Sequence, residues 1–197
     1  MCKVVYLTSR CFDWRSEEFK QDLATELRSR GVEVVTQTTC WLKTLFRKHK
    51  TYGIAIAFDF FRDGTDGCGL TLNRQCSYLS RDFAYAISND MDLLTPMIRW
   101  RDFKFVTSED KDWYKFFNKV SSATKAIFYL CTSTTPTEYD VFREAQPKIV
   151  KAFADEIIRC LRSNYDYLQY QKSLRIAKTK YNNRNKRMEG SSDGMVK

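Results

Sequence analysis

Residues 3–36, KVVYLTSRCFDWRSEEFKQDLATELRSRGVEVVT, decide the fold class. The run KVVYLT (3–8) is rich in β-branched residues, which predicts a buried strand. Apolar residues then recur at helical spacing, and we expect Ser16 to cap the helix that they form. Gly31 ends this helix, and VEVVT (32–36) predicts a second strand. A strand, a helix and a strand in this order predict a βαβ unit with two parallel strands.

Further strands and helices are predicted from the same patterns of apolar residues. The most apolar run is GIAIAFDFF (53–61), which predicts a central strand, and AIFYLC (126–131) predicts another. Helical spacing of apolar residues predicts helices over 79–91 and 147–161. We therefore expect an α/β fold of three layers, a mainly parallel sheet flanked by helices. Its neighbouring strands are expected at 3–8, 32–36, 54–59 and 126–131.

Three other segments carry local predictions. WLKTLFRKHK (41–50) predicts a short basic helix, and DGTDGCG (63–69) predicts a loop rich in turns. Trp113, Phe116 and Phe117 lie within five residues of one another on a predicted helix. Large aromatic residues at this spacing are more often core than interface, so we expect them to anchor that helix against the sheet or, alternatively, to line a surface groove that binds a partner.

Charge divides the chain into a body and a tail. The 197 residues carry a net charge of +9, and residues 171–197 hold +6 of it. We expect a single domain over residues 1–170 and a basic, flexible tail over 171–197. The tail is either a solubilising terminus or a contact for an anionic partner, which would be a nucleic acid, a membrane or a wall polymer. Its candidate electrostatic residues are Lys172, Arg175, Lys178, Lys180, Arg184, Lys186 and Arg187.

The cysteines and the single histidine indicate which metal sites the sequence excludes and which compartment it favours. The seven cysteines include no CxxC pair, and His49 is the only histidine, which excludes a zinc finger. No secretory signal precedes the cysteines, so we expect reduced thiols and a cytoplasmic protein. No apolar run approaches the roughly 20 residues of a membrane-spanning helix.

The order of segments resembles the zinc-dependent N-acetylmuramoyl-L-alanine amidases, which cut peptidoglycan. The resemblance covers about residues 3–162 and rests on spacing and hydrophobic pattern. VVYLTSRC followed by QDLATELRSRGVEVV matches the family's first strand, helix and second strand. TLFRKHKTYGIAIAFDFFRDGTDGCGL (44–70) matches the helix, strand and loop that come next. YLSRDFAYAI (78–87) and ATKAIFYLCTSTTPTEYDVFREAQPKIVKAFADEII (123–158) match the later helix and the final strand, loop and helix.

The resemblance also implies where the family's metal ligands and catalytic base would fall. The first histidine ligand falls on or near Cys11, and the glutamate ligand on Glu18, or on Glu17 with a slip of one residue. The second histidine falls on Asp59, and the catalytic glutamate falls on Leu130. The amidase-like chemistry is therefore degenerate in this chain, because a leucine can neither deprotonate water nor protonate a leaving amine.

Each of these residues also has a purely structural interpretation. Cys11, Glu18 and Asp59 would give zinc one thiolate and two carboxylates, which is an unusual ligand set. Cys11 can equally be a small buried side chain, and Glu18 a charge in the first turn of a helix. Asp59 lies in an apolar strand, so it must be paired, lie at the strand end or be protonated, and Arg62 or Arg10 is its expected partner.

Two functions follow from this reading. The first is a non-catalytic binding or inhibitory protein on an amidase-like scaffold, with another protein as its partner, no cofactor, and a viral or mobile-element origin. The alternative is a cell-wall hydrolase with an altered metal site, in which zinc would be bound. A serine–histidine–aspartate triad lacks support, because the only histidine, His49, lies in a basic segment. A glycine-rich nucleotide-binding loop lacks support as well, because neither GxGxxG nor GxxxxGK followed by Ser or Thr occurs in the sequence.

Overall fold

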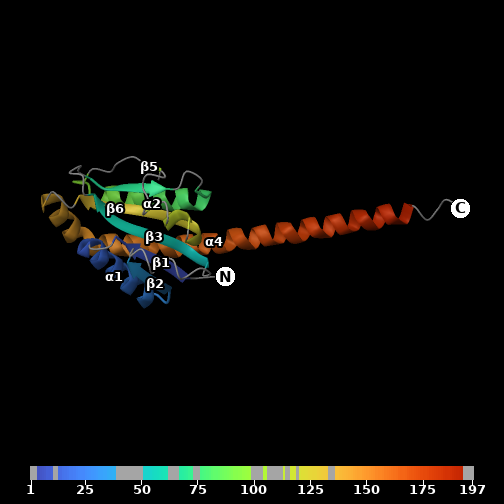
Figure 1. The fold of residues 1–197 in the computed structure, drawn as a ribbon, viewed down its shortest axis with the longest axis horizontal. Helices are drawn as coiled ribbons and strands as arrows, with labels where there is room; N and C mark the ends of the chain where they lie inside the picture. Colours follow the sequence, from blue (N-terminus) through green and yellow to red (C-terminus); the bar gives the residue numbers. More distant parts are fainter. Residues whose placement is uncertain are drawn as a thin grey trace. The chain divides into compact units, whose positions relative to one another are not determined.

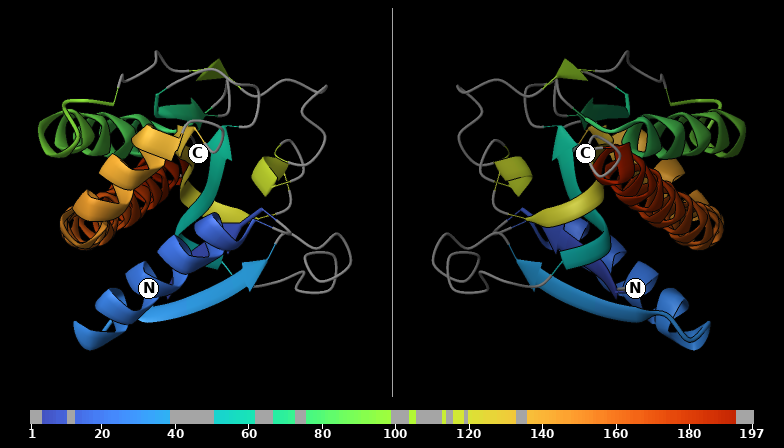
Figure 2. Two further views of the ribbon diagram at one scale, coloured as in Figure 1. Left: turned by 90° about the vertical axis from the view of Figure 1, so that its left-hand side faces the viewer. Right: turned by 90° about the vertical axis from the view of Figure 1, so that its right-hand side faces the viewer.

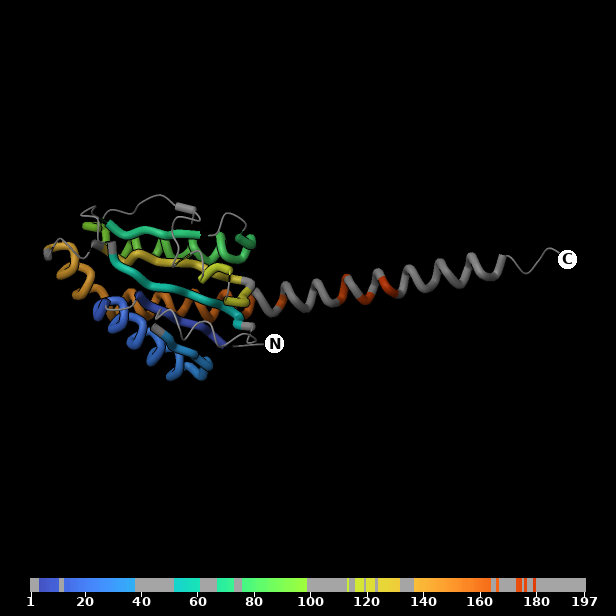
Figure 3. Tube along the Cα trace, viewed as in Figure 1, coloured from blue at the N-terminus to red at the C-terminus, as the bar shows by residue number. Residues whose placement is uncertain are grey.

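The structure is a computed structural model of the 197-residue chain. It describes residues 4–10, 13–38, 51–61, 67–72, 76–98, 104–105, 113, 116–118, 120–132 and 136–192 (Figure 3). The basic helix expected over 41–50 and the candidate Cys11 lie outside the described residues.

A six-stranded sheet forms the centre of the domain, in the order β2-β1-β3-β6-β4-β5 (Figure 1). Its strands are β1 (Val4–Ser9), β2 (Glu33–Thr38), β3 (Thr51–Phe61), β4 (Gly69–Leu72), β5 (Lys104–Phe105) and β6 (Ser121–Thr132). The four strands predicted from the sequence are neighbours in this sheet, which confirms that prediction.

Most of the strand pairs are parallel. β1 pairs in parallel with β2 and with β3, β3 pairs in parallel with β6, and β4 pairs in parallel with β5. The pair of β4 and β6 is antiparallel. The predicted α/β class with a mainly parallel sheet is therefore confirmed. The prediction of a loop over 63–69 is wrong at its end, because Gly69 begins β4.

Within the described residues, three helices are continuous: α1 (Trp14–Ser29), α2 (Tyr78–Leu94) and α4 (Pro136–Ser192). The cap of α1 is Asp13 and not Ser16, which lies inside the helix and donates its own hydroxyl proton to Asp13 Oδ2 at 2.6 Å. Gly31 follows the helix with a φ of 77°, a left-handed conformation that favours glycine.

One face of the sheet, the first face, is covered by α1, α2 and the part of α4 up to Leu161 (Figure 2). The apolar side chains buried between these helices and the sheet form the first core. The buried residues of the helices come from helical positions three or four apart, as an amphipathic helix requires. Phe19 of α1 and Phe153 of α4 lie with ring centroids 5.5 Å apart, and each also contacts Phe58 of β3. This aromatic cluster joins two helices to the central strand.

The opposite face carries the second core, formed by Val4 and Tyr6 of β1 with the helical residues near Trp113. Trp113, Phe116 and Phe117 are 3%, 5% and 2% exposed, so the prediction that they anchor a helix against the sheet is confirmed. The short helical stretch at 116–118 lies on this side in Figure 2. Helices therefore cover both faces of the sheet, and the domain has the three layers that we expected.

Helix α4 differs most from its prediction. We expected it to begin at Pro147, but it begins at Pro136 and Pro147 lies inside it. Tyr139 and Phe142 extend its buried side towards the start and stabilise the additional turns by packing. The helix also continues to Ser192, so the segment that we expected to be a flexible tail is helical up to that residue. Lysine and arginine, which are common there, both favour helices.

The chain forms two compact units, residues 1–161 and residues 162–197. The first contains the sheet and both cores. The second consists of the end of α4 and the last residues of the chain. None of the helices that the structure describes is long and apolar enough to cross a membrane.

Candidate functional site

The ends of the parallel strands place several polar residues at one edge of the sheet. β1 ends at Ser9, which is followed by Arg10, and β3 brings Asp59 to the same edge. β1 lies between β2 and β3 in the sheet, so the chain passes from β1 to β2 on one side and then crosses to β3 on the other side. In open α/β sheets, ligands bind beyond the carboxyl ends of strands where the strand order reverses in this way. This edge is therefore the candidate site.

Asp59 is buried at this edge and is paired with a cation. Only 1% of its side chain is exposed, and its Oδ2 lies 2.6 Å from Nε of Arg10. Its Oδ1 accepts a hydrogen bond from the backbone N–H of Phe60 at 2.9 Å. The Arg10 guanidinium carbon also lies 5.3 Å from the centre of the Trp113 ring. The structure thus selects Arg10 as a partner of Asp59, one of the two that the sequence suggested, while Arg62 lies outside the described residues.

A second charged cluster lies on the other face of the same edge. The ammonium of Lys20 is buried and contacts Glu17 Oε2 at 2.6 Å, the carbonyl oxygen of Gln37 at 2.9 Å and Ser9 Oγ at 3.2 Å. Ser9 Oγ donates to the same Glu17 oxygen at 2.7 Å. A serine beside a lysine can be a nucleophile and its base. Here Glu17 binds the ammonium and Ser9 is fully buried, so the arrangement stabilises the charged lysine instead.

The hydrogen bonds of Glu17 give the fold a dependence on pH. Burial raises the pKa of Glu17, but hydrogen bonds from Lys20, Gln21 and Ser9 outweigh it and hold the pKa below the ordinary value of 4.5. A lowered pKa stabilises the fold above the unfolded-state pKa, and this contribution is lost as the pH falls through the folded-state pKa. We expect the free energy of unfolding to fall less steeply below about pH 4.5 in Glu17→Gln than in the parent protein.

Urea unfolding at a series of pH values measures this difference. Glu18→Gln is the matched control, because it removes one carboxylate from the exposed neighbouring position of the same helix. Identical pH profiles for Glu17→Gln and the parent protein would contradict the prediction.

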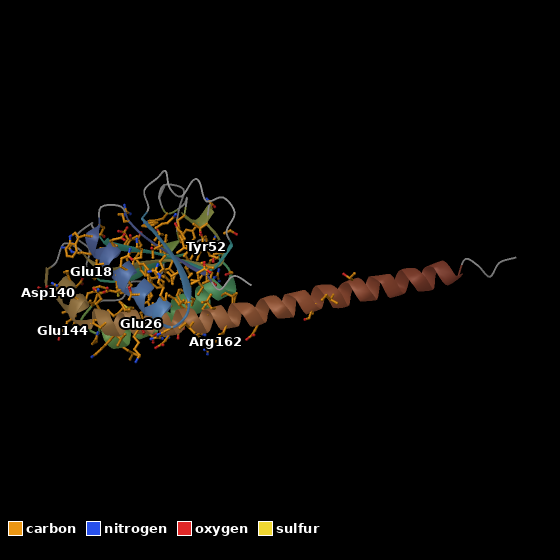
Figure 4. The ribbon with its side chains drawn as sticks, turned by 90° about the horizontal axis from the view of Figure 1, so that it is seen from below. Glu18, Glu26, Tyr52, Asp140, Glu144 and Arg162 are labelled. Carbon is orange, nitrogen blue, oxygen red and sulfur yellow. The ribbon has the colours of Figure 1, made fainter. Side chains whose placement is uncertain are left out.

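The structure separates the residues that the resemblance had assigned to one site. Glu18 is exposed on α1, where Figure 4 labels it, whereas its neighbour Glu17 faces the strand edge. Of the two alternatives for the glutamate ligand, Glu17 therefore has the more suitable position. Leu130 is 1% exposed and belongs to the apolar cluster of the first face.

A bulge in β6 explains why Cys131 lies in the same core as its neighbour Leu130. Along the pair of β3 and β6, Asp59 lies opposite Tyr129 but Phe61 lies opposite Thr132, so β6 contains one extra residue at this point. Leu130 and Cys131 consequently both belong to the first core, although alternation along a regular strand would separate them. Neither of them lies in the second core, next to which Asp59 and Arg10 pair.

These residues do not fit the zinc ion that the amidase resemblance implies. Asp59 is bound to Arg10 and Glu17 to Lys20, so a metal would have to displace a cationic side chain from each carboxylate. Burial raises the pKa of Cys131 far above its usual range, which keeps it a neutral thiol and a poor ligand. Among the described residues, no three His, Cys, Asp or Glu side chains are grouped as metal ligands would be.

Sequence reasoning missed the role of Lys20, although the sequence contains a signal for it. Lys20 occupies the buried side of α1 together with Ser16, Leu23 and Leu27, at spacings of three or four residues. A lysine at such a position must reach an acceptor, because burying an unpaired ammonium is costly. Its acceptors Ser9 and Gln37 are remote in sequence and could be identified only from the fold.

The domain is similar in fold to solved amidase structures. An N-acetylmuramoyl-L-alanine amidase from Clostridium difficile 630 aligns with a TM-score of 0.60 at 10% identity, over 82% of this chain and 98% of that chain. The amidase AmiC2 of Nostoc punctiforme gives 0.60 at 13% identity, over 81% and 98%. Cwp6 from Clostridium difficile gives 0.57 at 13% identity, over 83% of this chain and 29% of that chain. No protein-family model and no curated protein matches the sequence.

Proposed function

We propose that this protein uses an amidase-like scaffold to bind a partner and does not hydrolyse peptidoglycan. The observation that carries the proposal is the ion pair between Arg10 and Asp59, at 2.6 Å. By the resemblance, Asp59 stands where the amidases have a histidine ligand. The positively charged side chain of Arg10 is therefore bound to the group that would have to bind the metal.

Two further features support a loss of catalysis. Lys20 binds Glu17, the glutamate that faces the same edge. Leu130 stands where the resemblance places the general base, and it is buried in the apolar core. Loss of a general base costs on the order of 10²–10⁴ in rate, even where a metal is still bound.

Metal content and hydrolysis test the proposal together. We expect the purified protein, incubated with zinc and desalted, to retain no stoichiometric zinc by elemental analysis. We also expect it to release no peptides with N-terminal L-alanine from purified cell wall. The control is a variant with Asp59→Ala and Glu17→Ala, which removes both carboxylates. Zinc retention and peptide release by the parent protein, absent from this variant, would overturn the proposal in favour of a hydrolase with an altered metal site.

A further inference from the structure

Two buried polar atoms on the face of the sheet that carries Arg10 have no hydrogen-bond partner among the described residues. They are Oγ1 of Thr8 and Nε1 of Trp113, in side chains that are 0% and 3% exposed. An unsatisfied buried donor costs free energy, so each such group calls for an explanation, and a ligand that accepts its hydrogen bond is one.

The fold places both side chains on the same face as the ion pair. Thr8 and Arg10 are two residues apart on β1 and its extension, so their side chains leave the sheet on one side. Thr8 lies opposite Ala57 of β3, two residues before Asp59, which places Asp59 on that side as well. Trp113 belongs to the core of this face and lies under the Arg10 guanidinium, at 5.3 Å.

We infer that this edge is a binding site for a carboxylate group, held by Thr8, Arg10 and Trp113. The inference rests on the proposed binding function and names the chemistry that the site recognises. An indole N–H can only donate a hydrogen bond, a hydroxyl can donate one, and a guanidinium offers several donors. Arg10 is 32% exposed, so a ligand reaches the site along its side chain.

The charge of the site favours a carboxylate over phosphate. Asp59 neutralises much of the charge of Arg10, because its Oδ2 lies 2.6 Å from the guanidinium. A ligand with a single negative charge suits the remaining hydrogen-bond donors. A doubly charged phosphate would meet the carboxylate of Asp59 at short range, with unfavourable electrostatics.

The signal of the Trp113 indole N–H in a nitrogen–proton correlation spectrum tests the inference directly. The chain has four tryptophans, and Trp113→Phe identifies the signal of Trp113. We expect titration with N-acetyl-L-alanine to move this signal downfield in a saturable way. N-acetyl-L-alanine amide, which lacks the carboxylate, and inorganic phosphate are expected to leave it in place.

Two substitutions of Thr8 form a matched pair. Thr8→Val keeps the shape and removes the hydroxyl, so we expect the dissociation constant for N-acetyl-L-alanine to rise about tenfold. Thr8→Ser keeps the hydroxyl and is expected to bind like the parent protein. The dispersion of the spectrum shows whether each variant is folded.

Three outcomes would overturn the inference: no saturable shift with N-acetyl-L-alanine, an equal shift with the amide or with phosphate, or unchanged affinity in a folded Thr8→Val. A negative titration together with an absence of hydrolysis would refute the carboxylate site and leave the proposed function standing. Zinc-dependent hydrolysis would refute the proposed function whatever the titration shows.

Discussion

Replacing Arg10 with methionine is expected to lower the free energy of unfolding by about 2–4 kcal/mol. The substitution keeps a long apolar side chain against Trp113 but leaves the carboxylate of Asp59 buried, at 1% exposure, without the guanidinium that binds it at 2.6 Å. The cost comes from an uncompensated buried charge, which is more expensive than loss of the pair itself. Urea unfolding at neutral pH measures the change.

A double-mutant cycle identifies the origin of this cost. Asp59→Leu alone is expected to cost less than Arg10→Met, because the partly exposed guanidinium can turn towards water. The double variant Arg10→Met, Asp59→Leu is expected to regain most of the stability that Arg10→Met loses. Additive losses in the double variant would contradict the role of the ion pair.

Replacing Phe153 with alanine is expected to cost about 3–5 kcal/mol, the largest effect of any single substitution that we predict. Phe153 is 1% exposed. Its ring centroid lies 5.5 Å from that of Phe19, 5.7 Å from that of Phe58 and 5.0 Å from that of Phe128. The cavity left by the ring would open where α1, α4 and the two central strands meet, and four rigid elements cannot easily close it.

The matched control is Leu93→Ala on α2, where the side chain is 80% exposed. This substitution is expected to change the free energy of unfolding by no more than about 0.5 kcal/mol. Thermal unfolding of both variants beside the parent protein measures the contrast. A loss below about 1 kcal/mol in Phe153→Ala would mean that the aromatic cluster does not hold α4 to the sheet.

The central strands were predictable because burial on both faces leaves a continuous apolar run, as in 53–61. The strands at the other end of the sheet were not. Gly69–Leu72 and Lys104–Phe105 are too short to show a hydrophobic period. They form because β6 offers an edge for β4, and β4 then offers one for β5. This pairing depends on residues that are far apart in the sequence, so the local sequence does not predict it.

The candidate site was predictable in part for a related reason. A carboxylate inside an apolar run identified Asp59 as a residue that needs a partner, and the structure shows Arg10, 49 positions away. Thr8 and Trp113 gave no such signal, because a threonine in a strand and a tryptophan in a core are both ordinary. Their unsatisfied atoms become visible only once every neighbour is in place.

The position of β6 also has a consequence for biosynthesis. This strand lies between β3 and β4, yet the ribosome makes it after both. Until residues 121–132 have been synthesised, β3 lacks one neighbour and β4 lacks its link to the rest of the sheet. Unpaired apolar strands of this kind invite association between chains. The sheet therefore stays incomplete in the nascent chain until β6 has been synthesised.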